Sequence, residues 1–282
     1  MAKSDREPIL EAGNNILKRC RHGLMLFNRH DEFIGRSLEL YGEYNGGEAK
    51  FLMQLLRPGD TVVEVGANIG SHTIPIAEAV GPKGHVVAFE PQRGVFQLLC
   101  ANVGLNGLDQ IQPLQFAIGK QPGKARMLRP NYRKSGNFGS ISIGEQPGAT
   151  NPSDYESVIV GTLDNMLKLE SCRLLKVDCE GMELDVLKGA AEFIKTHKPF
   201  LYVENDRKEK SPALISFVLE LGYEAYWHTP LLFRRDNFYE NPEYVFEVER
   251  LASINMLAVP HGTKVINIDD KKITDPEDWW KD

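Results

Sequence analysis

The fold of this chain is decided by the stretch Thr61-Val62-Val63-Glu64-Val65-Gly66-Ala67-Asn68-Ile69-Gly70. Its first five residues are mostly apolar and β-branched and lead directly into glycine, which is typical of a strand buried on both faces of a parallel sheet. The residues from Ser71 to Val80 then predict a helix with Ser71 as its N-cap. A buried strand that turns into a helix through glycines indicates the start of a βαβ unit.

The same alternation of strand and helix continues along the chain. The pattern predicts strands over 85–89, 111–118, 174–178 and 200–203, and helices over 48–56, 92–105, 182–196 and 213–221. Consecutive right-handed βαβ units build a parallel sheet with helices on both faces. Apolar segments at 223–227, 231–233 and 256–259 have no helix pattern between them and predict an antiparallel hairpin near the end.

The chain divides into a central domain with weaker segments around it. We expect residues 1–46 to be an N-terminal lead-in with a short strand at 23–27, residues 47–262 to be one α/β domain, and residues 263–282 to be an acidic tail. An excursion at about 120–160, rich in Gly, Pro, Ser and Asn, interrupts the domain. Excursions of that length inside a compact domain are usually functional or mobile.

Composition excludes several classes of protein. The chain has 33 Lys and Arg against 39 Asp and Glu, so its net charge of −6 makes it a poor candidate for binding nucleic acid through phosphates. It has no apolar run long enough to span a membrane and no signal-peptide pattern, so we expect a cytoplasmic protein. The four cysteines are scattered without a CxxC pair, which favours reduced thiols. The oligomeric state stays open.

The glycine turn indicates a nucleoside cofactor. A dinucleotide fingerprint, GxGxxG, would require glycine where Asn68 stands, and Glu64 would repel a pyrophosphate but would suit a cationic amino group. Glu90 ends the next strand, where a carboxylate accepts hydrogen bonds from ribose hydroxyls. Together these features favour S-adenosylmethionine over NAD. An NAD-dependent oxidoreductase and a non-catalytic nucleoside-binding scaffold remain the alternatives.

Acidic residues follow two later strands. Asp178 and Glu180 follow the strand at 174–178, and Glu204 and Asn205 follow the strand at 200–203. The carboxyl ends of parallel strands face the ligand crevice, so these side chains are expected to converge there. Two mechanisms fit: Asp178, Glu180 and Glu204 supply a catalytic base, or Asp178, Glu204 and Asn205 hold magnesium or manganese. We favour the direct base.

Four segments carry a family resemblance: VVEVGANIGSHTIPIA (62–77), VVAFEP (86–91), LLKVDCEGMELDVLKGA (174–190) and LYVEND (201–206). They resemble the FkbM-like family of S-adenosylmethionine-dependent methyltransferases. The resemblance implies a Rossmann-like, seven-stranded, mostly parallel sheet with an antiparallel end, and O-methylation of a hydroxyl on a sugar, glycan or polyketide-type small molecule. The predicted cofactor-binding residues are Glu64, Gly66, Ala67, Asn68, Gly70, Thr73, Glu90, Ala117 and Asp178, among which Thr73 and Ala117 match the family less closely.

Histidines and basic residues near these motifs have simpler interpretations. His72 directly follows the glycine turn, so lining the site is one alternative, but at the start of a helix we expect it to be a surface or capping group. His228 is a weaker candidate base. The basic side chains of the excursion, namely Arg126, Arg129, Arg133 and Lys134, are expected to form a solvated face rather than a lid for an anionic acceptor.

Overall fold

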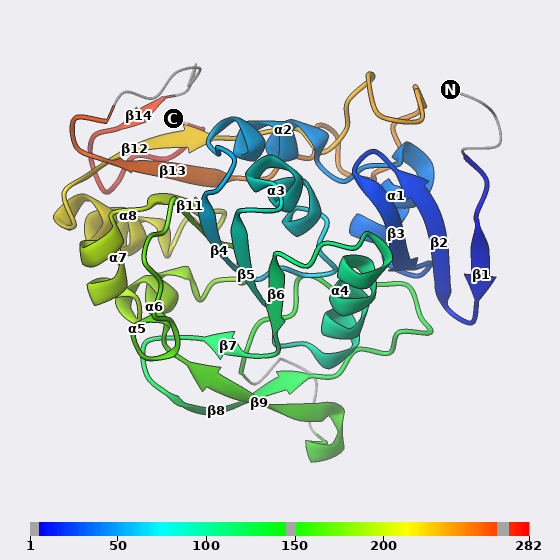
Figure 1. Cartoon of the computed structure of the whole chain (residues 1–282), viewed down its shortest axis with the longest axis horizontal. Coiled ribbons are helices and arrows are strands. Elements are labelled where there is room, and N and C mark those ends of the chain that lie inside the picture. The colour runs from blue at the N-terminus through cyan, green and yellow to red at the C-terminus, as the bar shows by residue number, and fades with distance from the viewer. Residues whose placement is uncertain (1–5, 145–150, 264–270, 282) are drawn as a thin grey trace.

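The computed structural model describes residues 6–144, 151–263 and 271–281 (Figure 1). Its main sheet contains eight described strands in the order β14-β12-β13-β11-β10-β4-β5-β6. Their bounds are β4 Thr61–Val65, β5 His85–Phe89, β6 Ile111–Leu114, β10 Leu174–Val177, β11 Phe200–Glu204, β12 Tyr223–His228, β13 Asn255–Pro260 and β14 Lys272–Ile273.

The main sheet is mixed, with a parallel centre and an antiparallel end. The strands β6, β5, β4, β10 and β11 pair in parallel, whereas β13 runs antiparallel to both β11 and β12, and β14 runs antiparallel to β12. The expected antiparallel end is therefore present, but the expected count of seven strands is not, because β14 adds an edge strand. The segment 231–233, expected to be a strand, contributes only an isolated bridge from Leu231 to Ala252.

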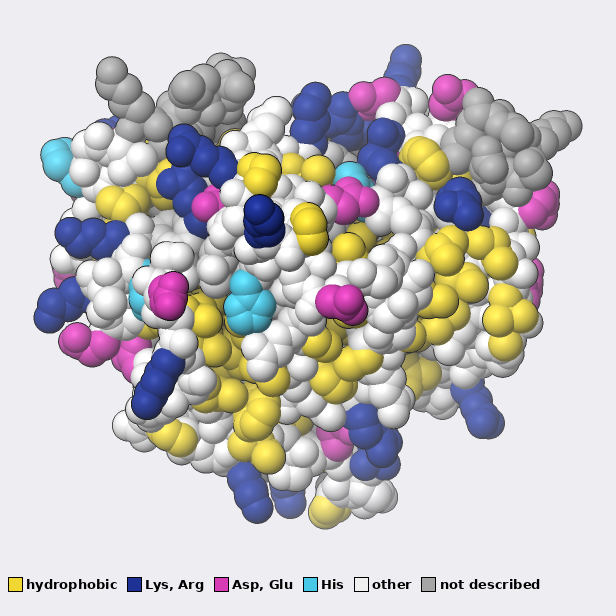
Figure 2. All heavy atoms as spheres, viewed as in Figure 1, with side chains coloured by type: hydrophobic (Ala, Val, Ile, Leu, Met, Phe, Trp, Pro, Cys, Tyr) yellow, Lys and Arg dark blue, Asp and Glu magenta, His cyan; other side chains and the backbone are white. Residues whose placement is uncertain are grey.

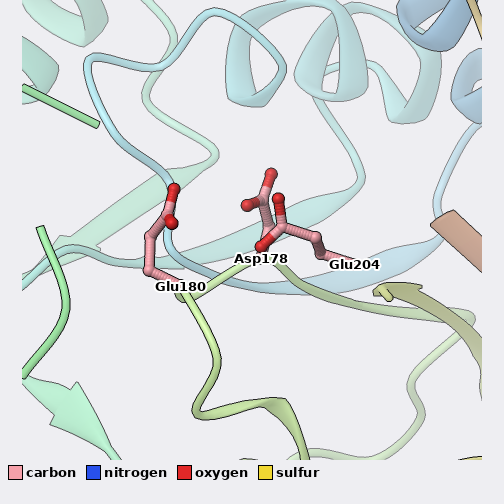
Figure 3. A group of neighbouring side chains, drawn as sticks. All are labelled: Asp178, Glu180 and Glu204. Atoms are coloured by element: carbon pink, nitrogen blue, oxygen red, sulfur yellow. The ribbon is translucent and has the colours of Figure 1, made fainter. Parts of the chain in front are cut away.

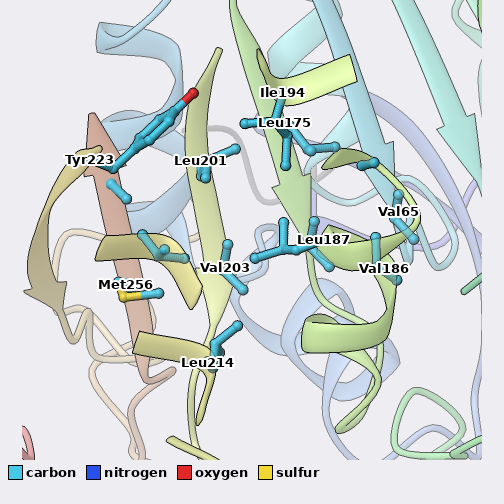
Figure 4. Packing of buried hydrophobic residues seen from close by; sticks show 14 of the residues in the cluster. Val65, Leu175, Val186, Leu187, Ile194, Leu201, Val203, Leu214, Tyr223 and Met256 are labelled. Atoms are coloured by element: carbon cyan, nitrogen blue, oxygen red, sulfur yellow. The ribbon is translucent and has the colours of Figure 1, made fainter. Parts of the chain in front are cut away.

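Helices cover both faces of this sheet, and successive side chains of a central strand point alternately to the two faces. Val63 and Val65 of β4 face a core with α6 Glu183–Lys188, α7 Ala191–His197 and α8 Ser211–Glu220, part of which is drawn in Figure 4. Val62 faces the opposite core, formed with α2 Gly46–Gln54, α3 Thr73–Val80 and α4 Arg93–Leu105. The uninterrupted apolar runs in the sequence thus reflect burial on both faces.

Two small sheets lie outside the main one. The N-terminal sheet consists of β1 Leu10–Ala12, β2 Asn15–Cys20 and β3 Gly23–Asn28, and it packs with α1 Ile34–Tyr41 against α4. The single strand expected at 23–27 is therefore β3, which pairs with β2 in a sheet of three strands. The excursion forms most of the other small sheet, which consists of β7 Ala117–Ile118, β8 Gly123–Leu128 and β9 Tyr155–Gly161. A short helix, η2 Pro152–Asp154, directly precedes β9.

Several expected elements have different ends in the structure. The strand expected over 111–118 splits into β6 and β7, which belong to different sheets, and the helix expected over 182–196 splits into α6 and α7. The short helix α5 Leu163–Met166 was not expected. His72, and not Ser71, occupies the N-cap position of α3. All four cysteines are free, as expected.

The turn after β4 brings two strand ends into direct contact. Gly66 has φ 85°, a conformation that costs an L side chain energy. A Cβ atom on Gly66 would also collide with the backbone oxygen of Asp178, at the end of β10. Glycine is therefore required here for both its conformation and its size.

We expect Gly66→Ala to lower the free energy of unfolding by about 3 kcal/mol, because strain and overpacking add at this position. Gly59→Ala is the matched control: Gly59 has φ 92° with open space around it, so only the strain of about 1 kcal/mol is expected. Chemical denaturation measures both variants. Equal losses in the two would contradict the close approach described above.

Candidate functional site

The carboxyl ends of β4, β5, β10 and β11 open into one cavity of about 330 Å³. Nine of the residues expected at the site line it: Glu64, Gly66, Ala67, Asn68, Glu90, Ala117, Asp178, Glu180 and Glu204. Three others, Gly70, Thr73 and Asn205, do not. The structure thus brings the glycine turn and the acidic residues, which are distant in sequence, into one cavity.

Glu90 is locked to the glycine turn. Its Oε2 accepts a hydrogen bond from the backbone N–H of Asn68 (3.0 Å), and its Oε1 accepts one from that of Gln92 (2.8 Å). Burial raises the pKa of Glu90 to about 7, against these two hydrogen bonds, which lower it. Because a carboxylate oxygen accepts more than one hydrogen bond, Glu90 can still bind hydroxyl donors from the cavity.

One wall of the cavity is apolar and comes largely from the excursion. Met127, Ile141 and Ile143 pack with Ala117 in a small cluster, and all four line the cavity. The excursion is also tied to the start of α4, because Gln92 Nε2 donates to the carbonyl oxygen of Phe138 (3.2 Å). This wall suits a flat apolar group such as a purine.

The basic side chains of the excursion lie elsewhere. The four residues are exposed, and none of them lines the cavity, as expected for a solvated face: Arg126, Arg129, Arg133 and Lys134. Figure 2 shows Lys and Arg side chains on one face of the molecule, scattered singly or in small groups with Asp and Glu between them.

Three carboxylates lie together in the cavity (Figure 3), and we call Asp178, Glu180 and Glu204 the acidic trio. Each offers an oxygen, and these oxygens all lie within 4.8 Å of one another. Glu180 has φ 59°, and Arg207 Nη2 donates to its Oε2 (3.0 Å). Among the described residues, nothing hydrogen-bonds to the buried Oε2 of Glu204.

The trio favours bound protons or cations. Burial and the nearby Asp178 raise the pKa of Glu180 to about 7, although Arg207 opposes them. Burial and Asp178 also hold the pKa of Glu204 well above its usual range. Carboxylates this close can exchange a proton with a substrate or share a divalent cation.

Glu64 is already paired with an ammonium group of the protein. The residue is fully buried, its Oε2 accepts a hydrogen bond from Thr73 Oγ1 (2.6 Å), and Lys176 Nζ lies 3.5 Å from its Oε1. The sequence interpretation assigned Glu64 to the amino group of a cofactor and overlooked Lys176. The available signal was a lysine inside the apolar strand Leu174–Val177.

Lys176 is a buried cation among carboxylates. It is 1% exposed, and its Nζ donates to Asp178 Oδ2 (3.0 Å). Burial alone would lower the pKa of Lys176, but Asp178, Glu64 and the buried Glu48 of α2 together raise it above its ordinary value. The ammonium group is therefore charged at any physiological pH.

The expectation for His72 was wrong. His72 is 5% exposed, makes no side-chain capping bond and lines the cavity, because α2 packs on α3 and covers its start. Burial and Lys176 lower its pKa well below the usual range, so the ring is neutral. Its Nδ1 lies 3.7 Å from Glu48 Oε1. His228, by contrast, pairs with the hydroxyl of Tyr202 (2.8 Å) and does not line the cavity.

We expect Lys176→Met to destabilise the fold by about 3–5 kcal/mol, because it leaves the buried carboxylate of Glu64 without a counter-charge. The double variant Glu64→Gln/Lys176→Met should recover most of that loss, since two neutral side chains of similar volume replace the pair. Thermal and denaturant unfolding measure both. If Lys176→Met were as stable as Glu64→Gln/Lys176→Met, the ion pair between Glu64 and Lys176 would not contribute this stability.

No helix in the described part of the chain combines the length and the apolar character that crossing a membrane requires.

The segment that carries the site also matches a known protein family. Residues 64–225, from the glycine turn to β12, match the family model described as the methyltransferase FkbM domain. The chain is 30% identical over 174 residues to the hexuronic acid methyltransferase AglP of Haloferax volcanii, covering 58% of this chain and 63% of that protein. It is 27% identical over 150 residues to Methyltransferase 1 of Beauveria bassiana, covering 47% of this chain and 59% of that protein.

Among solved structures, the chain is similar to the methyltransferase FkbM from Methylobacillus flagellatus, with 18% identity, a TM-score of 0.47, and coverage of 80% of this chain and 55% of that one. The chain spans less than two thirds of the length of the curated relatives named here. The family match covers more than half of its residues and includes the glycine turn, Glu90 and the acidic trio. This chain is a member of the FkbM methyltransferase family.

Proposed function

We propose that this protein transfers a methyl group from S-adenosylmethionine to a hydroxyl oxygen of a sugar, glycan or polyketide-type small molecule. One observation carries the proposal: a single cavity joins the glycine turn, the carboxylate of Glu90 and the acidic trio. Methyl transfer needs a site for the cofactor beside a site that handles the proton of the acceptor, and these features supply both.

The cofactor would lie along the glycine turn. Glu90 would accept the ribose hydroxyls, and the apolar wall with Ala117 would hold the adenine. Gly66, Ala67 and Asn68 would face the methionine part, with Asp178 beside the methyl group. Gly70 and Thr73 would act indirectly, since Gly70 accepts the N–H of Ile74 at the start of α3 and Thr73 holds Glu64.

An NAD-dependent oxidoreductase is the weaker candidate. Asn68 replaces the middle glycine of the dinucleotide fingerprint, and a pyrophosphate would meet a cavity lined by several carboxylates. A non-catalytic scaffold would not require the acidic trio. Bringing several carboxylates together in a buried site costs free energy, and such clusters are typical of catalytic or ion-binding sites.

The chemistry is an in-line displacement. The acceptor oxygen bonds to the methyl carbon, the carbon–sulfur bond breaks with its electrons going to sulfur, and S-adenosylhomocysteine leaves. The hydroxyl proton passes to a carboxylate of the trio. Asp178 is the proposed base because its partly exposed side chain, 34% accessible, can return the proton to water. Glu180 and Glu204 would orient the acceptor.

A divalent cation is the alternative way to activate the acceptor. The structure favours Asp178, Glu180 and Glu204 as its ligands over the set with Asn205, because Asn205 does not line the cavity. All-oxygen ligation suits magnesium or manganese. Such an ion would lower the pKa of the acceptor hydroxyl.

The acceptor class rests on the relatives. One of them is named as a hexuronic acid methyltransferase, which supports a sugar acceptor. The composition still favours a small molecule or glycan over a nucleic acid.

Calorimetry tests the cofactor. We expect S-adenosylmethionine and S-adenosylhomocysteine to bind and NAD to fail. Affinity should rise from about pH 6 to about pH 8, because Glu90 has a pKa of about 7 and ribose hydroxyls donate to its ionised form. Glu90→Gln should weaken binding by roughly ten- to hundredfold and remove most of the pH dependence. An unchanged pH profile in Glu90→Gln would rule out this role.

Turnover tests the acidic trio. Asp178→Asn should lower methyl transfer by about a hundredfold or more, measured by mass spectrometry of a glycan and metabolite pool incubated with labelled cofactor. Asp185→Asn is the matched control, since Asp185 lies in the first turn of α6 and does not line the cavity. Full activity of Asp178→Asn would refute the assignment.

The same assay after exhaustive chelation separates the two mechanisms. Undiminished transfer is expected for a carboxylate base. Transfer that disappears and returns with manganese would favour the bound cation.

A further inference from the structure

We propose that Lys176 is a positioning residue of the methyl-transfer site, which holds Asp178 at the cavity from inside the sheet; this inference rests on the proposed function. Lys176 lies in the segment 174–190 that resembles the family, but it is neither a predicted cofactor-binding residue nor a member of the acidic trio. Lys176 itself borders the cavity, and its proposed effect on the reaction passes through its contact with Asp178.

The sheet fixes where Lys176 lies. Its strand, β10, is paired on both sides, and in the register of the parallel strands Lys176 stands beside Glu64 of β4 and Tyr202 of β11. Alternate residues of a strand face the same side, so Lys176 and Asp178 project together. Lys176 is 1% exposed, so its side chain has little freedom to leave this position.

The ammonium group of Lys176 contacts two carboxylates. Its Nζ lies 3.0 Å from Asp178 Oδ2 and 3.5 Å from Glu64 Oε1. In the described part of the chain, no other Lys or Arg nitrogen lies within 4.0 Å of either carboxylate. Asp178 Oδ1 makes no hydrogen bond to a described residue, and the carboxylates of Asp178 and Glu204 lie together in Figure 3.

This arrangement fixes one oxygen of Asp178 and leaves the other for the acceptor. Asp178 is 34% exposed, so without Lys176 its carboxylate could turn to water. A lysine that served only as a counter-charge for Glu64 would have no need to donate to Asp178. The shorter of its two contacts is nonetheless the one to Asp178.

The test separates the contact between Lys176 and Asp178 from the buried ion pair between Lys176 and Glu64. In a Glu64→Gln background, Asp178 is the carboxylate left within 4.0 Å of Lys176 Nζ among the described residues. Adding Lys176→Met therefore removes that contact without leaving a buried lone carboxylate at position 64. Lys176→Gln in the same background is a second variant in case Met disturbs the fold, and thermal unfolding confirms that each is folded.

The readout is the NMR signal of the methyl carbon of S-adenosylmethionine labelled with carbon-13 at the methyl group and bound to the protein. We expect this signal to differ between Glu64→Gln and Glu64→Gln/Lys176→Met, and the difference to vanish when both also carry Asp178→Asn. Turnover of the acceptor found in the labelled pool should fall at least tenfold on adding Lys176→Met, with KM for the cofactor changed less than threefold.

Failure of the positioning role and failure of the proposed function give different outcomes. Identical signals and rates with and without Lys176 would overturn the positioning role, as would a difference that persists in the Asp178→Asn background. If the unaltered protein binds no labelled cofactor at all, the proposed function fails and the inference fails with it.

Discussion

The structure depends on the close approach of two backbones, at Gly66 after β4 and at Asp178 after β10. Gly66 adopts φ 85° and has no room for a Cβ atom because the carbonyl oxygen of Asp178 lies against it. The same contact aligns the ends of β4 and β10, whose parallel register sets Glu64 beside Lys176. The glycine turn and the acidic trio therefore share one cavity because these two strands are neighbours.

Charge inside the cavity is only partly balanced within the protein. Lys176 is buried between Glu64 and Asp178, which offsets the cost of removing these groups from water. The acidic trio is less fully compensated, since Arg207 reaches Glu180 and no described residue hydrogen-bonds to the buried Glu204 Oε2. Lys176 therefore stays charged, while the raised pKa values of Glu180 and Glu204 let these two carboxylates gain or lose protons.

Local sequence patterns predicted the central strands well. β4 and β5 have the bounds expected from their apolar, β-branched runs, because a strand buried on both faces leaves an unmistakable pattern. The short or exposed strands were missed. β1 is exposed along its length, and β14 has two residues in a polar segment, so neither carries a pattern that distinguishes it from a loop.

By itself, the sequence determined the order of strands and helices, the glycine turn, the carboxylates at the strand ends and, through these motifs, the methyltransferase family. The tertiary structure decided which of those groups meet. It buried His72 under α2, left Asn205 outside the cavity that the acidic trio lines, and paired Glu64 with Lys176. The physical reason is that strand register and helix packing join residues that are distant in sequence, and no local pattern of residues encodes such a pairing.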